Sequence, residues 1–168
     1  MDPMEPPPEI MRKALPNDIQ RLVAFMAEFY AEGGYPLNRR RATEAFAALL
    51  ADDRLGHVWL IQSDSLDVGH VVLTLCFSVE YGGLIAFVDD LFVQAPFRRA
   101  GLGTAALAGV RDFCAERGVR ALFVETGPDN AAAQAVYRRA GFVNTDRQLL
   151  ALRLADPTHV GEGLQSGD

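Results

Sequence analysis

The chain has few of the residues that build covalent or metal-bound frameworks. Of its 168 residues only two are cysteines, Cys76 and Cys114, and no group of cysteines and histidines stands at the spacing of a metal site. Two thiols cannot form a disulfide framework, and both stand in apolar runs, one in an expected strand and one in an expected helix. We therefore expect two buried thiols in a reducing compartment, and no metal.

Long apolar runs and an excess of basic residues are missing as well. No apolar stretch reaches membrane-spanning length, and the N-terminus carries two acids and the run Pro6-Pro7-Pro8 rather than basic residues ahead of an apolar core. Lys and Arg number 16 against 22 Asp and Glu, a formal charge of -6. This balance argues against nucleic acid as a partner and leans towards cationic small molecules. A cytoplasmic enzyme without a membrane partner is the expectation.

What the chain does contain is sufficient for one folded domain. Hydrophobic residues make up 49% and charged residues 23%, ordinary values for a globular protein of this length. We expect a single domain over residues 9–155, with flexible tails at 1–8 and 156–168.

Apolar periodicity divides this domain into helices and strands. Helices are predicted at 17–33, 37–52, 104–117 and 130–140, and strands at 9–14, 57–62, 68–78, 87–93, 119–125, from 142 onward and at 148–154. The first helix has Asn17 as its candidate N-cap, and Leu22, Val23 and Tyr30 stand on its apolar face.

The lengths of the connections predict how the strands pair. The first strands are joined by tight turns and must be antiparallel, because a parallel return needs a crossover of about a dozen residues. The strand at 119–125 follows a helical crossover and is expected to lie parallel to the strand before it. The prediction is a mixed α/β sheet of about seven strands, mostly antiparallel and twisted, with helices on both faces.

The stretch 87–103 joins the central strand to a helix through a loop rich in glycine and arginine. Pro96 ends the strand, Arg98 and Arg99 follow, and Gly101 and Gly103 open the helix. Amides at a helix start have no partner within the helix, and with the helix dipole they favour an anion. Glycine lets a diphosphate approach the main chain closely, so the stretch predicts a phosphate-binding loop.

The pattern Arg98-x-x-Gly101-x-Gly103 resembles the acyl-CoA signature of the GNAT superfamily of N-acyltransferases. Asn130 and Tyr137, ahead of a Gly-Phe pair, resemble the second signature of that family. The resemblance implies a GNAT fold with the sheet splayed at the cofactor, and acetyl-CoA as that cofactor. It also implies cofactor contacts from the residues at the strand end, the loop and the last helix: Leu91, Phe92, Val93, Arg98, Arg99, Ala100, Gly101, Leu102, Gly103, Thr104, Asn130 and Tyr137.

The same glycines also satisfy another phosphate-binding pattern. Gly101-x-Gly103-x-x-Ala106 follows a strand and opens a helix, as in dinucleotide-binding folds, and Glu125 ends a strand about twenty residues later. In that motif the first glycine follows its strand almost at once, whereas residues 94–100 intervene here. Too little chain remains after Glu125 to complete a doubly wound sheet. An NTPase loop lacks its Gly-Lys-Ser/Thr.

An amine acceptor is protonated at neutral pH, so a transferase of this class needs a base. Asp89 and Asp90 are the candidates, and strand alternation points them to opposite faces. The resemblance to small-amine acetyltransferases favours Asp89 as the base, which leaves Asp90 to the acceptor. Two adjacent acids at a strand end can also simply cap a helix or pair with arginine. Glu80 and Glu125 are lesser candidates.

Tyr137 is the candidate acid that protonates the departing thiolate. It lies two helical turns after Asn130, so both residues project to about the same side of the helix. The alternatives are a tyrosine packed in the core and an asparagine that only caps the helix. Tyr30, Tyr35 and Tyr81 are expected to line an acceptor pocket built by the first two helices and the turn at 78–83.

These residues together predict transfer of an acetyl group from acetyl-CoA to the primary amine of a small molecule by direct attack. Alternatives are a protein N-terminal or lysine acetyltransferase, and a GNAT-fold protein that binds acyl-CoA without turnover. A homodimer is expected by analogy with the family alone.

Overall fold

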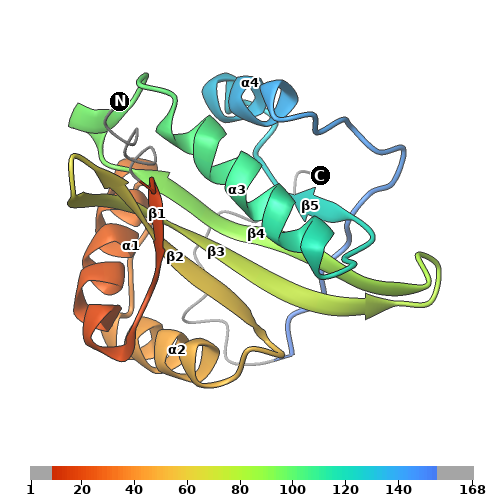
Figure 1. Cartoon of the computed structure of the whole chain (residues 1–168), viewed down its shortest axis with the longest axis horizontal. Helices are drawn as coiled ribbons and strands as arrows, with labels where there is room; N and C mark the ends of the chain where they lie inside the picture. The colour runs from red at the N-terminus through yellow and green to blue at the C-terminus, as the bar shows by residue number, and fades with distance from the viewer. Residues whose placement is uncertain (1–8, 155–168) are drawn as a thin grey trace, which may run out of the picture.

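Helices cover both faces of one twisted sheet in the computed structural model, which describes residues 9–154 (Figure 1). Within these residues the sheet contains five strands: β1 (Met11–Lys13), β2 (Gly56–Ser63), β3 (Leu66–Ser78), β4 (Gly83–Val93) and β5 (Leu122–Val124). The helices are α1 (Ile19–Gly33), α2 (Arg39–Ala51), α3 (Leu102–Glu116) and α4 (Ala131–Arg139), with short 3-10 turns η1 (Pro16–Asp18) and η2 (Ala95–Phe97).

The strands lie in the sheet in chain order. β1 to β4 pair antiparallel with their neighbours, and β5 pairs parallel with β4 after the crossover through α3. This confirms the predicted meander, the parallel fifth strand and the mixed sheet. A doubly wound sheet with several parallel strands is incompatible with this order, so the dinucleotide-binding alternative is wrong.

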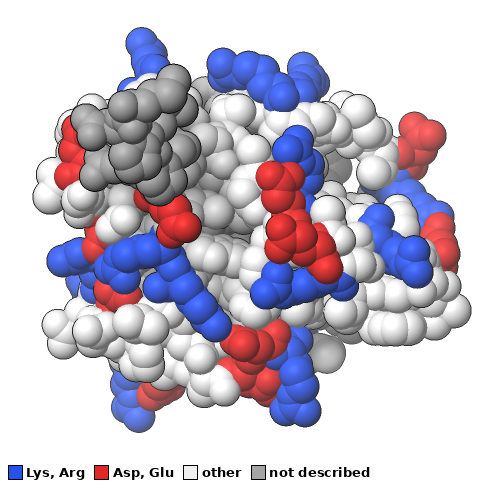
Figure 2. All heavy atoms as spheres, viewed as in Figure 1, with Lys and Arg blue, Asp and Glu red and all other residues white. Residues whose placement is uncertain are grey.

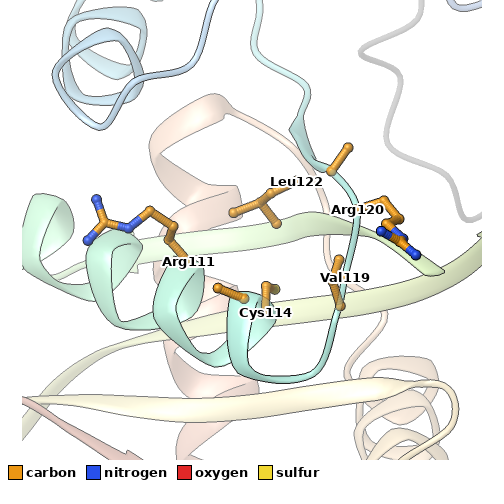
Figure 3. A pocket seen from close by; sticks show the side chains of 7 residues that line it. Arg111, Cys114, Val119, Arg120 and Leu122 are labelled. Atoms are coloured by element: carbon orange, nitrogen blue, oxygen red, sulfur yellow. The ribbon is translucent and has the colours of Figure 1, made fainter. Parts of the chain in front are cut away.

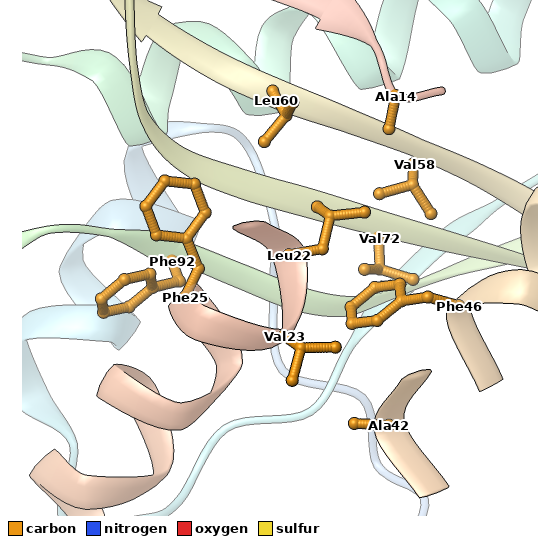
Figure 4. Packing of buried hydrophobic residues seen from close by; sticks show 10 residues of the cluster. All are labelled: Ala14, Leu22, Val23, Phe25, Ala42, Phe46, Val58, Leu60, Val72 and Phe92. Atoms are coloured by element: carbon orange, nitrogen blue, oxygen red, sulfur yellow. The ribbon is translucent and has the colours of Figure 1, made fainter. Parts of the chain in front are cut away.

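One core lies between the sheet and the first two helices (Figure 4). Leu22, Val23 and Phe25 of α1 and Phe46 of α2 pack onto the sheet, as the helical periodicity of the sequence predicts for Leu22 and Val23. The partners from the strands are Val58, Leu60, Val72 and Phe92. Phe92 therefore fixes the end of β4 against α1.

A second core holds α3 and α4 against the other face of the sheet. Val110 and Cys114 are buried on α3, and the burial of Cys114 is as predicted. Val136 and Tyr137 of α4 pack against this cluster and are partly buried. The two helices that carry the sequence signatures are thus fixed on one side of the sheet.

Three predicted details are wrong. Asn17 does not cap α1, because it lies inside η1 and Asp18 is the residue that precedes the helix. Cys76 is exposed rather than buried. It lies near the end of β3, in the β3–β4 hairpin that extends past α1 and α2 in Figure 1.

The last two predicted strands are the third error. Residues 142–154 adopt no regular structure, although their sequence favours a strand. A strand forms only where a second strand accepts and donates its hydrogen bonds, and this segment lies apart from β5. The predicted tails at 1–8 and 156–168 fall outside the described residues.

Charged side chains of both signs are interspersed over the surface. On the face drawn in Figure 2, acidic and basic residues lie next to one another. Arg54 pairs with Asp52 and Arg111 with Asp112, both across exposed contacts that stabilise the fold little. No helix within residues 9–154 is both long and apolar enough to span a bilayer.

A partly buried ion network joins β1, η1 and the start of β3. The guanidinium of Arg12 donates to both carboxylate oxygens of Asp18 at 2.9 and 2.8 Å and to those of Asp67 at 3.1 and 2.8 Å. Arg21 also pairs with Asp67. The hydrogen bonds from Arg12 lower the pKa of Asp18 below its ordinary 3.8. The short strand β1 is held in place by this network as well as by its three pairs with β2.

The network predicts a loss of stability in acid. A carboxyl whose pKa is lowered by folding contributes stability above its unfolded pKa, and this contribution disappears as the pH falls through its folded pKa. We expect Asp18→Asn to lower the free energy of unfolding by about 1–3 kcal/mol at pH 7, and to flatten its decline below pH 3.8. Urea denaturation at pH 7 and pH 3 measures both. Asp112→Asn, at an exposed pair, serves as control and is expected to change neither.

Candidate active site

The central feature of the site is the point where β4 parts from β5. The two strands pair only through Ala86, Phe87 and Val88. On its other side β4 stays paired with β3 as far as Val93. Residues 89–93 therefore have one edge without a strand among the described residues, so their main-chain groups on that edge are available to a ligand. This is the predicted splay.

A β-bulge occurs at the same point. Val72 of β3 lies opposite Asp90, and the next residue, Leu73, lies opposite Val88, so Asp89 is an extra residue in β4. The predicted projection of the two acids to opposite faces is wrong for this reason. Val88 and Leu91 both pack on the α3 face, and the bulge leaves Asp89 and Asp90 together between them.

The environment of the two acids favours a proton acceptor. Asp89 is exposed, yet the surrounding protein removes part of its hydration, and this desolvation raises the pKa of Asp89 above its ordinary 3.8. The negative charges of Asp90 and Glu125 raise it further. Desolvation and the charges of both aspartates also raise the pKa of Tyr30, which places this α1 side chain in the same electrostatic environment.

His70 lies behind Asp90 in the core. It is fully buried, stacks on Phe25 with parallel rings 6.1 Å apart, and lies at the edge of Phe46. Its Nε2 is 3.8 Å from Asp90 Oδ2, and neither ring nitrogen has a hydrogen-bond partner among the described residues. Asp90 therefore has a histidine on its protein side, whereas Asp89 does not.

The loop after β4 is fixed to α1 by two polar contacts. The side-chain amide of Gln94 donates to Glu28 at 2.9 Å. Arg98 donates to Glu32 at 2.6 and 2.8 Å and to the carbonyl of Val93 at 2.7 Å. The guanidinium of Arg98 thus holds the loop in place, while Arg99 is exposed with φ +64.

The amides at the start of α3 are available to an anion. Gly101 precedes the helix with φ +79, a conformation that favours glycine. Within residues 9–154, no hydrogen bond uses the amides of Gly101, Leu102, Gly103 or Thr104. These four amides and the helix dipole make the cradle that the sequence predicts, with Ala100 exposed at its rim.

The last helix places the second signature beside this cradle. Asn130 caps α4 by accepting from the amide of Ala133 at 3.1 Å, so the capping role weighed for it is present. A Cβ on Gly103 would stand 3.9 Å from Val136, which shows how closely α4 approaches the start of α3. Tyr137 is partly buried against Phe142, at a ring distance of 5.7 Å. Burial, and then the charge of Asp90, raise the pKa of the phenol.

A cleft of about 1190 Å³ lies beyond β5 and has Tyr137, Phe123 and Glu125 in its wall. Its outer wall is the segment 143–149. A smaller hollow of about 180 Å³ lies at the C-terminal end of α3, where Arg111, Cys114 and Arg120 line it (Figure 3). None of the predicted site residues lines this hollow.

The predicted acceptor residues do not come together. Tyr30 lies near the two acids, as its pKa shift shows. Tyr81 lies in the β3–β4 turn against Phe123, at the opposite end of β4 from the contacts with α1. Tyr35 is exposed just after α1, with its ring over Gly33. Two groups that sequence analysis did not single out, His70 and the α1 glutamates, lie at the site. The only signal for His70 was a polar residue within the apolar run 68–75.

Together the fold and the site define a protein class: an α/β domain with an open strand edge beside an anion-binding helix start. The chain belongs to the acetyltransferase (GNAT) family, whose family model matches residues 20–142. Acetyl-CoA is the acyl donor of this family.

Solved structures and curated proteins agree with this assignment. An integron cassette protein from the mobile metagenome of Cole Harbour Salt Marsh is 48% identical, with a TM-score of 0.82 over 90% of this chain and 94% of that one. An aminoglycoside N-acetyltransferase solved with CoA shares the fold, with a TM-score of 0.67, 18% identity, and coverage of 86% of this chain and 99% of that one.

The curated relatives are matched over a shorter stretch. Aminoglycoside N(6')-acetyltransferase type 1 of Salmonella typhimurium is 30% identical over 63 residues, which are 38% of this chain and 43% of that protein. The match thus spans less than half of that relative.

The two ends of α3 provide a matched test of the anion cradle. Gly101 and Gly118 both have positive φ, +79 and +69, and a Cβ at either would meet nothing within 4 Å. Alanine at either site therefore introduces the same backbone strain, of about 1 kcal/mol. We expect Gly101→Ala to weaken CoA binding by about tenfold or more, because its methyl group stands where a diphosphate would approach. Gly118→Ala is expected to lose only stability. Calorimetric titration with CoA and thermal unfolding measure the two effects, and equal CoA affinities would contradict the cradle.

Proposed function

We propose that the protein transfers an acetyl group from acetyl-CoA to the primary amine of a small molecule. The observation that carries this proposal is the parting of β4 from β5 directly beside the unpaired amides of α3. The open edge of Leu91, Phe92 and Val93 suits an extended arm such as pantetheine, and the amides of residues 101–104 suit its diphosphate. When bound, acetyl-CoA supplies a thioester carbonyl that an uncharged amine can attack.

Asp89 is the base in this proposal, with Asp90 as the alternative. The proton of the acceptor ammonium moves to the Asp89 carboxylate, directly or through a water molecule. Desolvation and the charges of Asp90 and Glu125 raise the pKa of Asp89, which makes its carboxylate a stronger proton acceptor than that of an ordinary aspartate. Asp90 faces His70 and Tyr30, and we assign it to attraction of the cationic acceptor.

Tyr137 is the acid in this proposal. Its phenol donates a proton to the sulfur that leaves the acyl group. Burial and the nearby charge of Asp90 both raise the pKa of Tyr137. The phenol therefore keeps its proton at neutral pH, as a donor must.

The acceptor is a cationic amine in this proposal. Asp89, Asp90 and Glu125 place several negative charges near one another, and an ammonium group compensates part of their repulsion. The curated relatives carry the name of aminoglycoside acetyltransferases, so polyamines and aminoglycosides are the first amines to test. Release of free thiol from acetyl-CoA in the presence of each amine is the assay, and the proposal fails if calorimetry detects no CoA binding.

Replacing the proposed acid separates catalysis from binding. We expect Tyr137→Phe to lower kcat by about 100-fold or more, because the departing sulfur loses its proton donor. The affinity for CoA is expected to stay within about twofold of the unmodified protein, since the ring and its packing on Phe142 remain. Thiol release gives kcat, and calorimetry gives the affinity. A protein that only binds acyl-CoA shows no turnover in either form.

The two aspartates are distinguished by their pH profiles. A base works only when deprotonated, so kcat/KM falls as the pH drops through its pKa, and for Asp89 this limb lies above pH 3.8. We expect Asp89→Asn to lower kcat/KM by about 100-fold or more and to remove the acid limb. Asp90→Asn is expected to raise KM for the amine and keep the limb. The reverse pattern assigns the base to Asp90.

A further inference from the structure

His70 stands at a position of the sheet that favours an apolar residue. It lies in β3 opposite Leu60 of β2 and Phe92 of β4, and its side chain is fully buried. The rings of Phe25, Phe46 and Phe92 surround it, at centroid distances of 6.1, 6.3 and 6.2 Å. Both ring nitrogens lack a hydrogen-bond partner among the described residues. Because a buried polar atom without a partner costs stability, packing alone favours a residue such as leucine here.

One charged group lies within reach of the imidazole, the carboxylate of Asp90. Its Oδ2 is 3.8 Å from Nε2 of His70, which is longer than a hydrogen bond of about 2.7–3.2 Å. The pairing of β3 with β4 explains this approach. Asp90 lies opposite Val72, two residues along β3 from His70, and side chains two residues apart share a face of the sheet. A small rotation of the Asp90 side chain therefore brings its oxygen to Nε2 without movement of the main chain.

Asp90 connects the buried imidazole to the groups of the proposed site. Its side chain is 16% exposed, so the carboxylate meets the protein on one side and solvent on the other. Burial, and then the charge of Asp90, raise the pKa of Tyr30 on α1 and of Tyr137 on α4. The carboxylate is thus close enough to act on groups from both helices, and the direction in which its oxygens point matters to a bound amine.

We propose that His70 is a positioning residue for Asp90: its Nε2–H donates to Oδ2 and holds the other carboxylate oxygen towards the ammonium group of the acceptor. This inference rests on the proposed function, in which Asp90 attracts a cationic amine. A neutral imidazole carries one N–H, and in this arrangement its proton is on Nε2. A carboxylate held in one orientation loses less entropy on binding an ammonium group than a freely rotating one. His70 therefore raises the affinity for the amine at the expense of stability.

Two substitutions separate positioning from packing. Leucine is apolar and close to histidine in volume, whereas glutamine places an amide N–H near the position of Nε2. We expect His70→Leu to raise KM for the amine about tenfold and to keep kcat and the CoA affinity within about twofold. Its Tm is expected to rise by about 2–4 °C, since a ring with unpartnered nitrogens is removed. His70→Gln is expected to keep KM within about threefold of the unmodified protein while lowering Tm.

The affinity for the amine and the stability of the fold thus change in opposite directions in these two variants, which a purely structural role does not produce. Thiol release gives KM and kcat, and thermal unfolding gives Tm. In an Asp90→Asn background, His70→Leu is expected to have no further effect on KM, because the carboxylate that it positions is gone. An unchanged KM in His70→Leu overturns the proposal, as does an effect that simply adds to that of Asp90→Asn.

Nitrogen NMR of the histidine rings tests the contact without substrate. The chain has three histidines, and His70→Gln identifies which signals belong to His70. We expect a proton on Nε2, and a shift of the Nε2 signal in Asp90→Asn but not in Asp89→Asn. A proton on Nδ1 alone, or equal shifts in the two variants, overturns the proposal even where amines are acetylated. A shift specific to Asp90→Asn in a protein that acetylates no amine contradicts the proposed function and supports the contact between His70 and Asp90.

Discussion

The site depends on one constraint, the register at which β4 stops pairing with β5. β4 stays paired with β3 as far as Val93, while its pairing with β5 ends at Val88. A strand that is paired on one edge only is held in position by that pairing, while the main-chain groups of its other edge remain available to a ligand. The free edge needs no rearrangement to receive a ligand, so the cost of ordering it has been met during folding.

The bulge at Asp89 places two carboxylates beside this open strand edge. Without the extra residue, Asp89 and Asp90 would alternate, and one of them would face the α3 core. With it, both carboxylates are free of that core, and their mutual repulsion contributes to the raised pKa of Asp89. His70 and the aromatic rings around it provide a buried, weakly polar backing to Asp90. The electrostatic interaction between two charges is stronger next to such a weakly polar region than in water, because the effective dielectric constant is lower there.

How much the sequence predicts depends on whether a feature is local. The glycine loop and Tyr137 were predictable because their chemistry lies within one short stretch and its flanking helix. The bulge was not, since it is a relation between the registers of β3 and β4. Exposure of Cys76 has the same origin: its apolar run predicts a buried strand, but burial needs a helix over that part of the hairpin.

The segment 148–154 shows that a local pattern can also predict a strand that does not form. Its leucines make strand formation favourable only if a paired edge is present, because an unpaired strand leaves its amides to water and its side chains exposed. The free edge of β5 meets the first need, and its apolar flanks meet the second. The sequence therefore favours a strand in this segment, but whether the strand forms depends on a paired edge that the local sequence does not encode.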